Sequence, residues 1–254
     1  MRILLTNDDG VNATGLKVLE AIARTLSDDI WIVAPADEQS GAGHSLTLTR
    51  PLRLRKIEER RFCVTGTPTD AVMMALHKVM AECKPDLILS GVNRGANLAE
   101  DVTYSGTVSA AMEGALAGVR SIALSQVYSK EGVGDEVSFA AAETWGAKVL
   151  RPLLGLDLPH RTLVNINFPA LAPEQVKGVR ISAQGFRDYG RLRIVSNRDP
   201  RGYEYHWFGL APTVETPAHK TDLEAVGDGY IAVTPLQLDL THRESLAALE
   251  AAYR

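Results

Sequence analysis

Short apolar runs alternate with helical patterns along about the first 170 residues of the chain, and this alternation allows few folds. The runs are rich in Ile, Leu and Val, which is typical of strands buried on both faces. Strands separated by helices indicate a parallel sheet with helices on both faces, since a parallel connection needs a crossover. We expect strands at residues 2–6, 30–34, 86–90, 121–125 and 162–167, and helices at residues 15–25, 68–80, 107–117 and 137–154.

Other stretches depart from this alternation. Residues 46–64 alternate in hydrophobicity without a helix and predict an antiparallel hairpin beside the parallel core. Residues 191–196 and 203–208 flank a turn-rich segment and predict a second hairpin. Residues 227–229 are expected to link two further short strands, and Thr241 with Glu244 to begin a last helix. We therefore expect an α/β core at residues 1–180 and a carboxyl-terminal hairpin and helix extension at residues 181–254, packed on the core or on another subunit.

Composition narrows the class of protein. The chain has 254 residues, 45% of them hydrophobic, and a formal net charge of −4. This charge gives no general attraction to polyanions, so we expect no nucleic-acid polymer as a partner. Because no apolar stretch approaches the roughly 20 residues that cross a bilayer, we expect a cytoplasmic protein without a membrane partner. Cys63 and Cys83 show no zinc-ligand spacing and are expected to be free thiols.

Two adjacent acids, Asp8 and Asp9, follow the first expected strand. Open α/β sheets bind ligands at the carboxyl ends of their strands. Neighbouring carboxylates repel each other unless a cation or a shared proton offsets the charge, so the pair indicates a divalent-metal site. The alternative is that both acids only cap the following helix, as Asp commonly does without any metal. Position alone does not separate these two interpretations.

Two later segments reach the same edge of the expected sheet. A Ser-Gly loop after the second strand contains Ser40, and Asn93 follows the strand at residues 86–90. Together with Asp8 and Asp9 they form a set of oxygen donors, which favours Mg²⁺, Mn²⁺ or Ca²⁺ over zinc. Standing alone, the loop would more simply be a mobile connection. His44 in this loop is left out of the catalytic set, because a lone His is more often structural.

The start of the helix at residues 107–117 resembles an anion site. Ser105, Gly106 and Thr107 combine two hydroxyls, a glycine that allows close approach and free backbone amides, which suit a phosphate. The plainer alternative is that Ser105 is only an N-cap and Gly106 only a packing contact.

Four segments resemble, in this order along the chain, the motifs of the SurE family of metal-dependent 5'-nucleotidases, also called survival protein E. They are TNDDG, the Ser-Gly loop, SGVNRGAN and YSGTVSAAMEG. The likeness includes GTPTDAV at 66–72 and the late TDLEAVGDGYIAVTPLQLDLT. It implies a Rossmann-like core, one divalent ion per subunit, and hydrolysis of nucleoside 5'-monophosphates to nucleoside and phosphate. It further implies activity on 3'-nucleotides and short polyphosphate. By matching positions, it implies metal ligands at Asp8, Asp9, Ser40 and Asn93 and phosphate contacts at Asn97, Ser105, Gly106 and Thr107.

Two mechanisms stay open. Water bound at the cation attacks phosphorus with Asp8 or Asp9 as its base, or one of these acids is the nucleophile and forms an aspartyl-phosphate. A non-catalytic nucleotide sensor is a competing class, although a phosphate site rarely needs two facing carboxylates. A haloacid-dehalogenase-type phosphatase is disfavoured, because it expects acids two positions apart.

The expected second hairpin is both basic and aromatic. It is either an arm that reaches a phosphate or base in a neighbouring subunit, or a solvated or interface arm. The aromatic side chains fit burial between subunits as well as base stacking. We expect a homodimer built partly from this region, and the family resemblance implies dimers or tetramers. The residues concerned are Arg187, Arg191, Arg193, Arg198, Arg201, Tyr203, Tyr205, Trp207 and Phe208.

Overall fold

A computed structural model describes residues 1–128, 138–187, 192–210 and 220–254. Its body is a nine-stranded sheet with the order β3-β4-β2-β1-β5-β6-β7-β11-β8. The central strands β1, β2, β5, β6 and β7 run parallel, which confirms the predicted mostly parallel α/β sheet. The strands of the body are β1 (Arg2–Thr6), β2 (Asp29–Pro35), β3 (Leu54–Glu58), β4 (Arg61–Val64), β5 (Leu87–Arg94), β6 (Arg120–Gln126), β7 (Thr162–Phe168), β8 (Val179–Ile181) and β11 (Ile231–Gln237).

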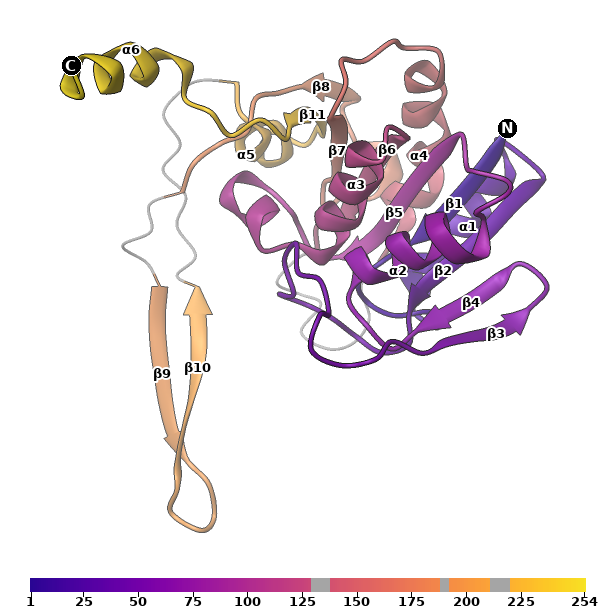
Figure 1. The fold of residues 1–254 in the computed structure, drawn as a ribbon, viewed down its shortest axis with the longest axis horizontal. Coiled ribbons are helices and arrows are strands. Elements are labelled where there is room, and N and C mark those ends of the chain that lie inside the picture. Colours follow the sequence, from indigo (N-terminus) through magenta and orange to yellow (C-terminus); the bar gives the residue numbers. More distant parts are fainter. Residues whose placement is uncertain (129–137, 188–191, 211–219) are drawn as a thin grey trace.

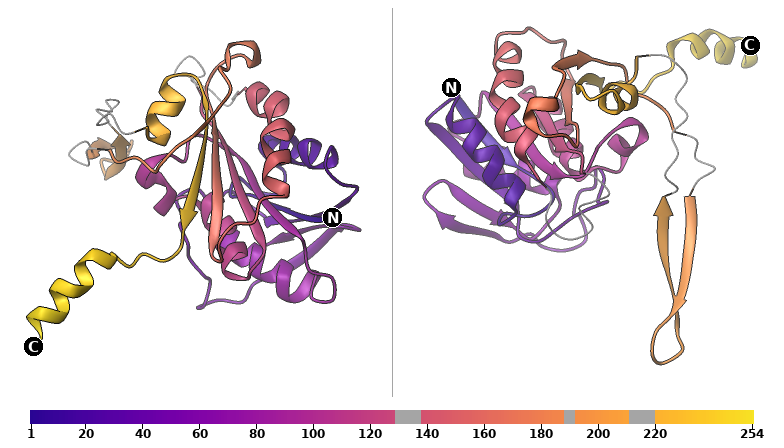
Figure 2. Two further views of the ribbon diagram at one scale, coloured as in Figure 1. Left: turned by 90° about the horizontal axis from the view of Figure 1, so that it is seen from above. Right: turned by 180° about the vertical axis from the view of Figure 1, so that it is seen from behind.

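Helices cover both faces of this sheet (Figures 1 and 2). On one face, α1 (Thr14–Arg24) and α4 (Ala140–Leu154) share a core cluster with Leu5. On the other, α2 (Pro68–Met74) and α3 (Gly106–Leu116) share a cluster with Leu4. Neighbouring residues of a strand point to opposite faces, so β1 contributes to both cores and is buried between the two helix layers.

Most predicted boundaries agree with the structure within a few residues, and two differ in a way that matters. Strand β5 continues to Arg94, so Asn93 lies within the strand rather than in the loop after it. The helix expected at residues 68–80 is α-helical only to Met74 and continues as a π-helix, Ala75–Val79. The expected start of the fourth helix at Val137 lies outside the described residues, and α4 begins at Ala140.

The hairpin predicted at residues 46–64 is present but shorter. Its strands are β3 and β4, and residues 46–53 have no regular structure. There Thr47 bonds to Asp70 instead of to a strand, and Pro51 has no N–H to donate. Strand β4 also pairs in parallel with β2, so the hairpin extends the sheet rather than lying beside it.

The prediction that residues 227–229 link two strands is wrong. A short helix, α5 (Asp222–Gly227), precedes them, and only β11 follows. The overlooked signal is a capping box in which Thr221 and Glu224 bond to each other's backbone. The last helix, α6 (Arg243–Ala252), is present, but its N-cap is His242 and not Thr241.

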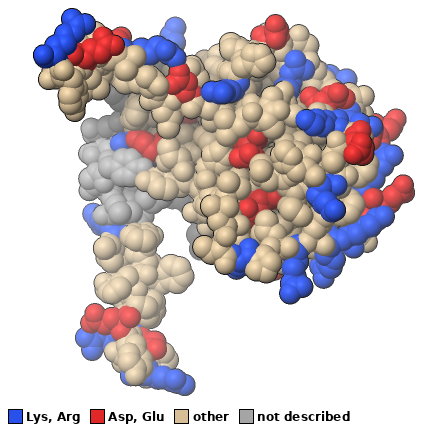
Figure 3. All heavy atoms as spheres, viewed as in Figure 1, with Lys and Arg blue, Asp and Glu red and all other residues tan. Residues whose placement is uncertain are grey.

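The second predicted hairpin is confirmed as β9 (Leu192–Arg198) and β10 (Glu204–Leu210), a separate two-stranded sheet. Arg191 lies outside the described residues. The hairpin and α6 stand apart from the body (Figures 1 and 2). In Figure 3 charges of both signs gather at the hairpin tip, while its shaft is largely uncharged. Within the described ranges, no helix combines the length and apolarity needed to cross a membrane.

Candidate active site

The acid pair lies directly beyond β1 and is held by two distant segments. Asp8 is only 4% exposed, and its Oδ1 accepts a hydrogen bond from the Thr107 hydroxyl at the start of α3. Asp9 is half-buried, and its Oδ2 accepts a hydrogen bond of 3.1 Å from the backbone N–H of Arg94 at the end of β5. The carboxyl ends of β1 and β5 and the amino end of α3 therefore meet at these two acids.

Burial makes both acids harder to ionise. It raises the pKa of Asp8 to about 6, against the lowering effect of the Thr107 hydrogen bond, and the charge of Asp9 adds to the rise. Burial likewise raises the pKa of Asp9, against the hydrogen bond and charge of Arg94, while Glu38 adds to the rise. A divalent cation would supply the positive charge that offsets this penalty. In the part of the chain that the structure describes, no three His, Cys, Asp or Glu side chains cluster for a metal, so a cation held by these two acids would need neutral oxygens as further ligands.

Asn93 follows an irregularity in β5 and directly precedes Arg94, whose backbone N–H bonds to Asp9. The pairing of β5 with β6 shifts register between Ser90 and Asn93. Gly91 occupies this shift with φ +134°, and a Cβ there would lie 2.2 Å from the carbonyl oxygen of Leu124, so a side chain has no room. Beyond the shift, Asn93 Nδ2 donates to the carbonyl of Gly95 at 3.0 Å, which orients its amide.

Ser40 belongs to a loop that starts beside Asp8 and returns along α3. The backbone N–H of Gln39 donates to the carbonyl of Asp8 at 2.8 Å. The exposed Ser40 hydroxyl donates to Glu38 Oε1 at 2.8 Å. The structure therefore brings the loop to the acid pair, while the hydroxyl itself is turned towards Glu38.

The same loop is fastened to α3 by a residue that was left out of the predicted site. His44 Nε2 lies 3.0 Å from Glu113 Oε2 on α3. Nearby, the backbone N–H of Gly43 donates to the carbonyl of Tyr104 at 3.1 Å. His44 thus has a partner on α3, and its exclusion from the catalytic set stays a prediction.

The start of α3 lies against Asp8. Ser105 is the N-cap of the helix, since its hydroxyl accepts a hydrogen bond of 3.0 Å from the N–H of Val108. Ser105 therefore caps α3, and a capping hydroxyl still has a proton to donate. A Cβ on Gly106 would lie 2.8 Å from the Cβ of Asp8, so the close approach requires glycine. The hydroxyl of Thr107 is donated to Asp8.

Asn97 is buried and fixed by three polar side chains that sequence reasoning missed. Its Nδ2 donates to Ser125 Oγ at 2.8 Å and its backbone N–H to Asn167 Oδ1 at 2.9 Å. Its carbonyl accepts from Asn165 Nδ2 at 2.8 Å and from Asn167 Nδ2 at 3.1 Å. The available signal was the pair of Asn residues on one face of an otherwise apolar strand, because buried polar groups need partners.

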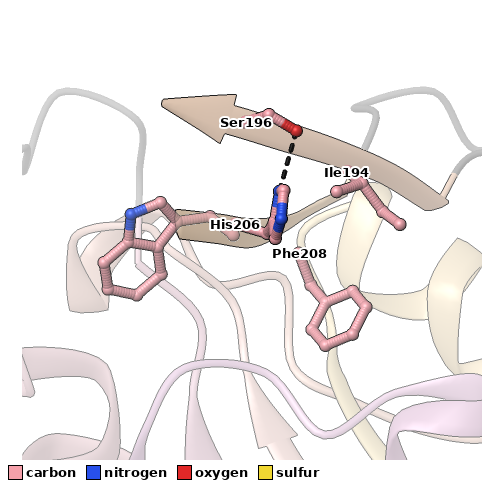
Figure 4. Close-up of a pocket in the computed structure, with 5 residues that line it drawn as sticks. Ile194, Ser196, His206 and Phe208 are labelled. Carbon is pink, nitrogen blue, oxygen red and sulfur yellow. Dashed lines mark hydrogen bonds between the residues drawn. The ribbon is translucent and has the colours of Figure 1, made fainter. Parts of the chain in front are cut away.

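A separate hollow of about 320 Å³ lies on the hairpin, far in sequence from the acid pair (Figure 4). Within it, Ser196 Oγ and His206 Nδ1 are hydrogen-bonded at 2.9 Å across β9 and β10. Ile194, Trp207 and Phe208 complete its lining, and Ile194 and Phe208 are 64% and 79% exposed. An open apolar hollow suits contact with another apolar surface better than phosphate chemistry.

The fold and the site together define a Rossmann-like α/β protein with an acid pair facing a helix N-terminus. The family model for survival protein SurE matches residues 3–191. A 5'-nucleotidase SurE from Rhizorhabdus wittichii is 67% identical over 254 residues, covering 100% of both chains. Another from Erythrobacter litoralis is 60% identical over 249 residues, covering 98% of both. The crystal structure of a SurE protein from Aquifex aeolicus matches with a TM-score of 0.85 at 37% identity over 100% of both chains. The chain belongs to the SurE family, as its motifs indicate.

Proposed function

We propose that this chain is a divalent-metal-dependent 5'-nucleotidase that hydrolyses nucleoside 5'-monophosphates to nucleoside and phosphate. The observation that carries the proposal is the acid pair, with Asp8 buried against the start of α3 and Asp9 half-buried beside it. An acid pair facing a helix N-terminus suits a site that binds both a cation and a phosphate. Two full-length relatives carry the name 5'-nucleotidase SurE, which supports the same substrate class.

The proposed metal ligands are Asp8, Asp9, Asn93 and Ser40, for one Mg²⁺ or Mn²⁺ per subunit, with Ca²⁺ as a third candidate. The hydrogen bonds to Asp8 and Asp9 each use one carboxylate oxygen and leave the other for a cation. The amide of Asn93 is turned so that Nδ2 faces Gly95, which leaves Oδ1 for the cation. Ser40 would have to turn from Glu38 to join them. When bound, the cation polarises a phosphoryl oxygen and lowers the pKa of a water ligand.

The proposed phosphate contacts come from the start of α3 and from Asn97. Ser105 donates its hydroxyl proton, and Gly106 and Thr107 offer backbone amides at the positive end of the helix dipole. Asn97 offers the second hydrogen of Nδ2, since the first goes to Ser125. These donors stabilise the charge that builds on the phosphoryl oxygens, while Asp8 or Asp9 accepts the proton of the attacking water.

The proposal extends to substrate range, assembly and location. The family likeness supports 3'-nucleotides and short polyphosphate as further substrates. Exposed apolar side chains on the hairpin support a homodimer or homotetramer in which residues 181–254 make contacts between subunits around the catalytic core at residues 1–180. Cytoplasmic residence is supported by the two free thiols, Cys63 and Cys83, which a reducing compartment preserves.

Phosphate release from AMP tests the function. With Mn²⁺ or Mg²⁺ we expect turnover that EDTA abolishes. Asp8→Ala and Asp9→Asn should each lower kcat/KM by at least about a thousandfold, because each removes a charged ligand. Asp28→Asn, which changes an exposed Asp, is the matched control and should retain activity.

Other outcomes of the same assay contradict the proposal. AMP binding without phosphate release would identify a nucleotide sensor, and full activity after exhaustive EDTA treatment would exclude metal dependence. Rapid acid quench with radiolabelled AMP separates the two mechanisms. Label retained on an Asp supports the aspartyl-phosphate, and its absence during steady turnover supports direct attack by water.

A further inference from the structure

Asp222, the first residue of α5, is a fully buried carboxylate far in sequence from the acid pair. Its Oδ2 accepts a hydrogen bond of 2.9 Å from the backbone N–H of Ala99. Its Oδ1 accepts hydrogen bonds of 2.9 Å from the backbone N–H groups of Gly185 and Leu223. Burial raises the pKa of Asp222, and these three N–H groups and the charge of Arg187 oppose the rise. The carboxylate thus joins two carboxyl-terminal segments to the loop that follows β5.

Ala99 is held on both sides of its backbone. While Asp222 accepts from its N–H, Gln184 Nε2 donates to its carbonyl at 3.0 Å. Ala99 has φ +53°, a left-handed conformation that is unfavourable by about 1–2 kcal/mol for a residue other than glycine. The contacts from Asp222 and Gln184 therefore stabilise a backbone shape that Ala99 would not adopt by itself.

The rest of this loop is held by Arg187. Its backbone N–H donates to Glu100 Oε1 at 2.6 Å, and its Nη1 donates to the carbonyl of Leu98 at 3.2 Å. Nη1 also pairs with the carboxylate of Asp101. The carboxyl-terminal segments therefore contact every residue of the loop from Leu98 to Asp101.

This loop separates the two parts of the proposed phosphate site. Asn97 lies just before it, fixed from β6 and β7 by Ser125 and Asn167. Ser105 lies just after it, and its backbone N–H donates to the carbonyl of Asp101 at 2.9 Å. The distance between Asn97 and the helix start thus depends on the shape of residues 98–101.

We propose that Asp222 is a positioning residue for phosphate: by holding Ala99 in its left-handed conformation, it sets Asn97 in register with Ser105 at the start of α3. The inference rests on the proposed function, since it concerns the same phosphate site. Asp222 touches no substrate. Asp8 and Asp9 closely follow β1, and Asp9 and Asn93 bond to backbone groups at the end of β5, before the loop begins. Of the contacts that hold these residues, the bond of Asp8 to Thr107 lies beyond the loop, so metal binding should depend on Asp222 much less than phosphate binding does.

Asp222→Asn tests the role at constant side-chain size. An amide has one acceptor oxygen, so it cannot accept from Ala99 on one side and from Gly185 on the other. A displacement of about 1 Å of a positioning group can lower a rate about a hundredfold. We expect the dissociation constant of inorganic phosphate, and kcat/KM for AMP, to worsen at least about tenfold in Asp222→Asn.

The controls separate positioning from general destabilisation. The affinity for Mn²⁺, measured by calorimetry, should stay within about twofold in Asp222→Asn, because Asp9 and Asn93 are held at the end of β5, before the loop begins. Asp228→Asn changes the exposed C-cap of the same helix, which pairs with Arg180, and should leave phosphate affinity unchanged. Where Asp222→Asn does not fold, Gln184→Ala takes its place, since it removes only the contact with the carbonyl of Ala99. It should weaken phosphate binding about threefold.

A double-mutant cycle completes the test. If Asp222 acts through Asn97, adding Asp222→Asn to Asn97→Ala should weaken phosphate binding by less than about twofold. The proposal would be overturned if the two substitutions weakened phosphate binding by the product of their separate effects. It would also be overturned if Asp222→Asn lowered the melting temperature without changing phosphate affinity, or weakened Mn²⁺ binding as much as phosphate binding. Failure of the proposed function is seen separately, as a parent protein that binds phosphate and Mn²⁺ but releases no phosphate from AMP.

Discussion

At the scale of single residues, Asp8 shows how burial controls the site. It is nearly inaccessible to solvent, and its one hydroxyl partner, Thr107, does not offset the penalty for burying its charge. A carboxylate with this pKa takes up a proton as the pH falls through about 6, unless a cation occupies its place. Protons and metal ions therefore compete for the same oxygens.

The raised pKa of Asp8 predicts how stability changes with pH in the metal-free protein. Its pKa is about 6 in the folded state and 3.8 in the unfolded state, so the folded state binds more protons between these values. The free energy of unfolding should therefore fall as pH rises from about 4 to about 6, by about 3 kcal/mol, and then level off.

Asp8→Asn removes this titration, so the free energy of unfolding should change less with pH in this variant than in the parent. Urea unfolding in EDTA between pH 4.5 and pH 8, followed by circular dichroism, measures the difference. The control Asp28→Asn should keep the slope of the parent. Parallel curves for the parent and Asp8→Asn would contradict the prediction.

At the scale of elements, the start of α2 holds the Ser40 loop in place. Asp70 completes the capping box with Thr67 and also accepts from Thr47 N at 3.0 Å and Thr47 Oγ1 at 2.6 Å. Burial would raise the pKa of Asp70, yet the hydrogen bonds from Thr47 and Thr67 outweigh it and lower the pKa. One carboxylate thus stabilises both a helix start and the returning end of the loop.

Asp70→Asn should lower the free energy of unfolding by about 2 kcal/mol at pH 7, because the amide loses charge-assisted hydrogen bonds. A carboxylate with a lowered pKa stabilises the folded state above pH 3.8, and this stabilisation is lost as the pH falls through the lowered pKa. The free energies of unfolding of Asp70→Asn and the parent should therefore converge in acid. Urea unfolding at pH 7 and pH 3 measures the difference. Thr67→Ser preserves the cap and should stay within about 0.5 kcal/mol of the parent. Equal stability of Asp70→Asn and the parent at pH 7 would refute this role.

Local patterns predicted the central elements well, because strand and helix periods and caps are visible in short windows. The N-cap at Ser105 is an example, since its hydroxyl caps α3 in the structure. Long-range placement was not visible in this way. The insertion of β11 beside β7, and the contacts of Asn165 with Asn97, join residues far apart in the chain. Such pairings depend on the whole fold rather than on local propensity.

At the scale of the whole molecule, the hairpin of β9 and β10 exposes several large apolar side chains to solvent. Ile194, Trp207 and Phe208 are each more than half exposed. Exposed apolar side chains in this number on one hairpin are typical of an interface, since their burial is favourable by about 25 cal/mol per Å². This observation supports the proposed homo-oligomer.

Light scattering at micromolar concentration should give a mass of two or four times 27.5 kDa for the parent. Replacing Trp207 and Phe208 together by Asp should lower that mass, because buried charges would face an apolar contact. Leu116→Asp makes the same kind of change at an exposed position of α3 and should leave the mass unchanged. A monomeric parent would refute the proposed assembly.

The place of β11 inside the sheet has a consequence for synthesis of the chain. Within the described chain, β8 is an edge strand whose neighbour is β11, yet β8 ends at Ile181 and β11 begins only at Ile231. During translation, every proposed metal and phosphate ligand and all of β8 are therefore synthesised well before β11, the strand that joins β8 to the body. A nascent chain of that length carries the reactive groups but has an open flank at β7, so completion of the sheet waits until β11 has been translated.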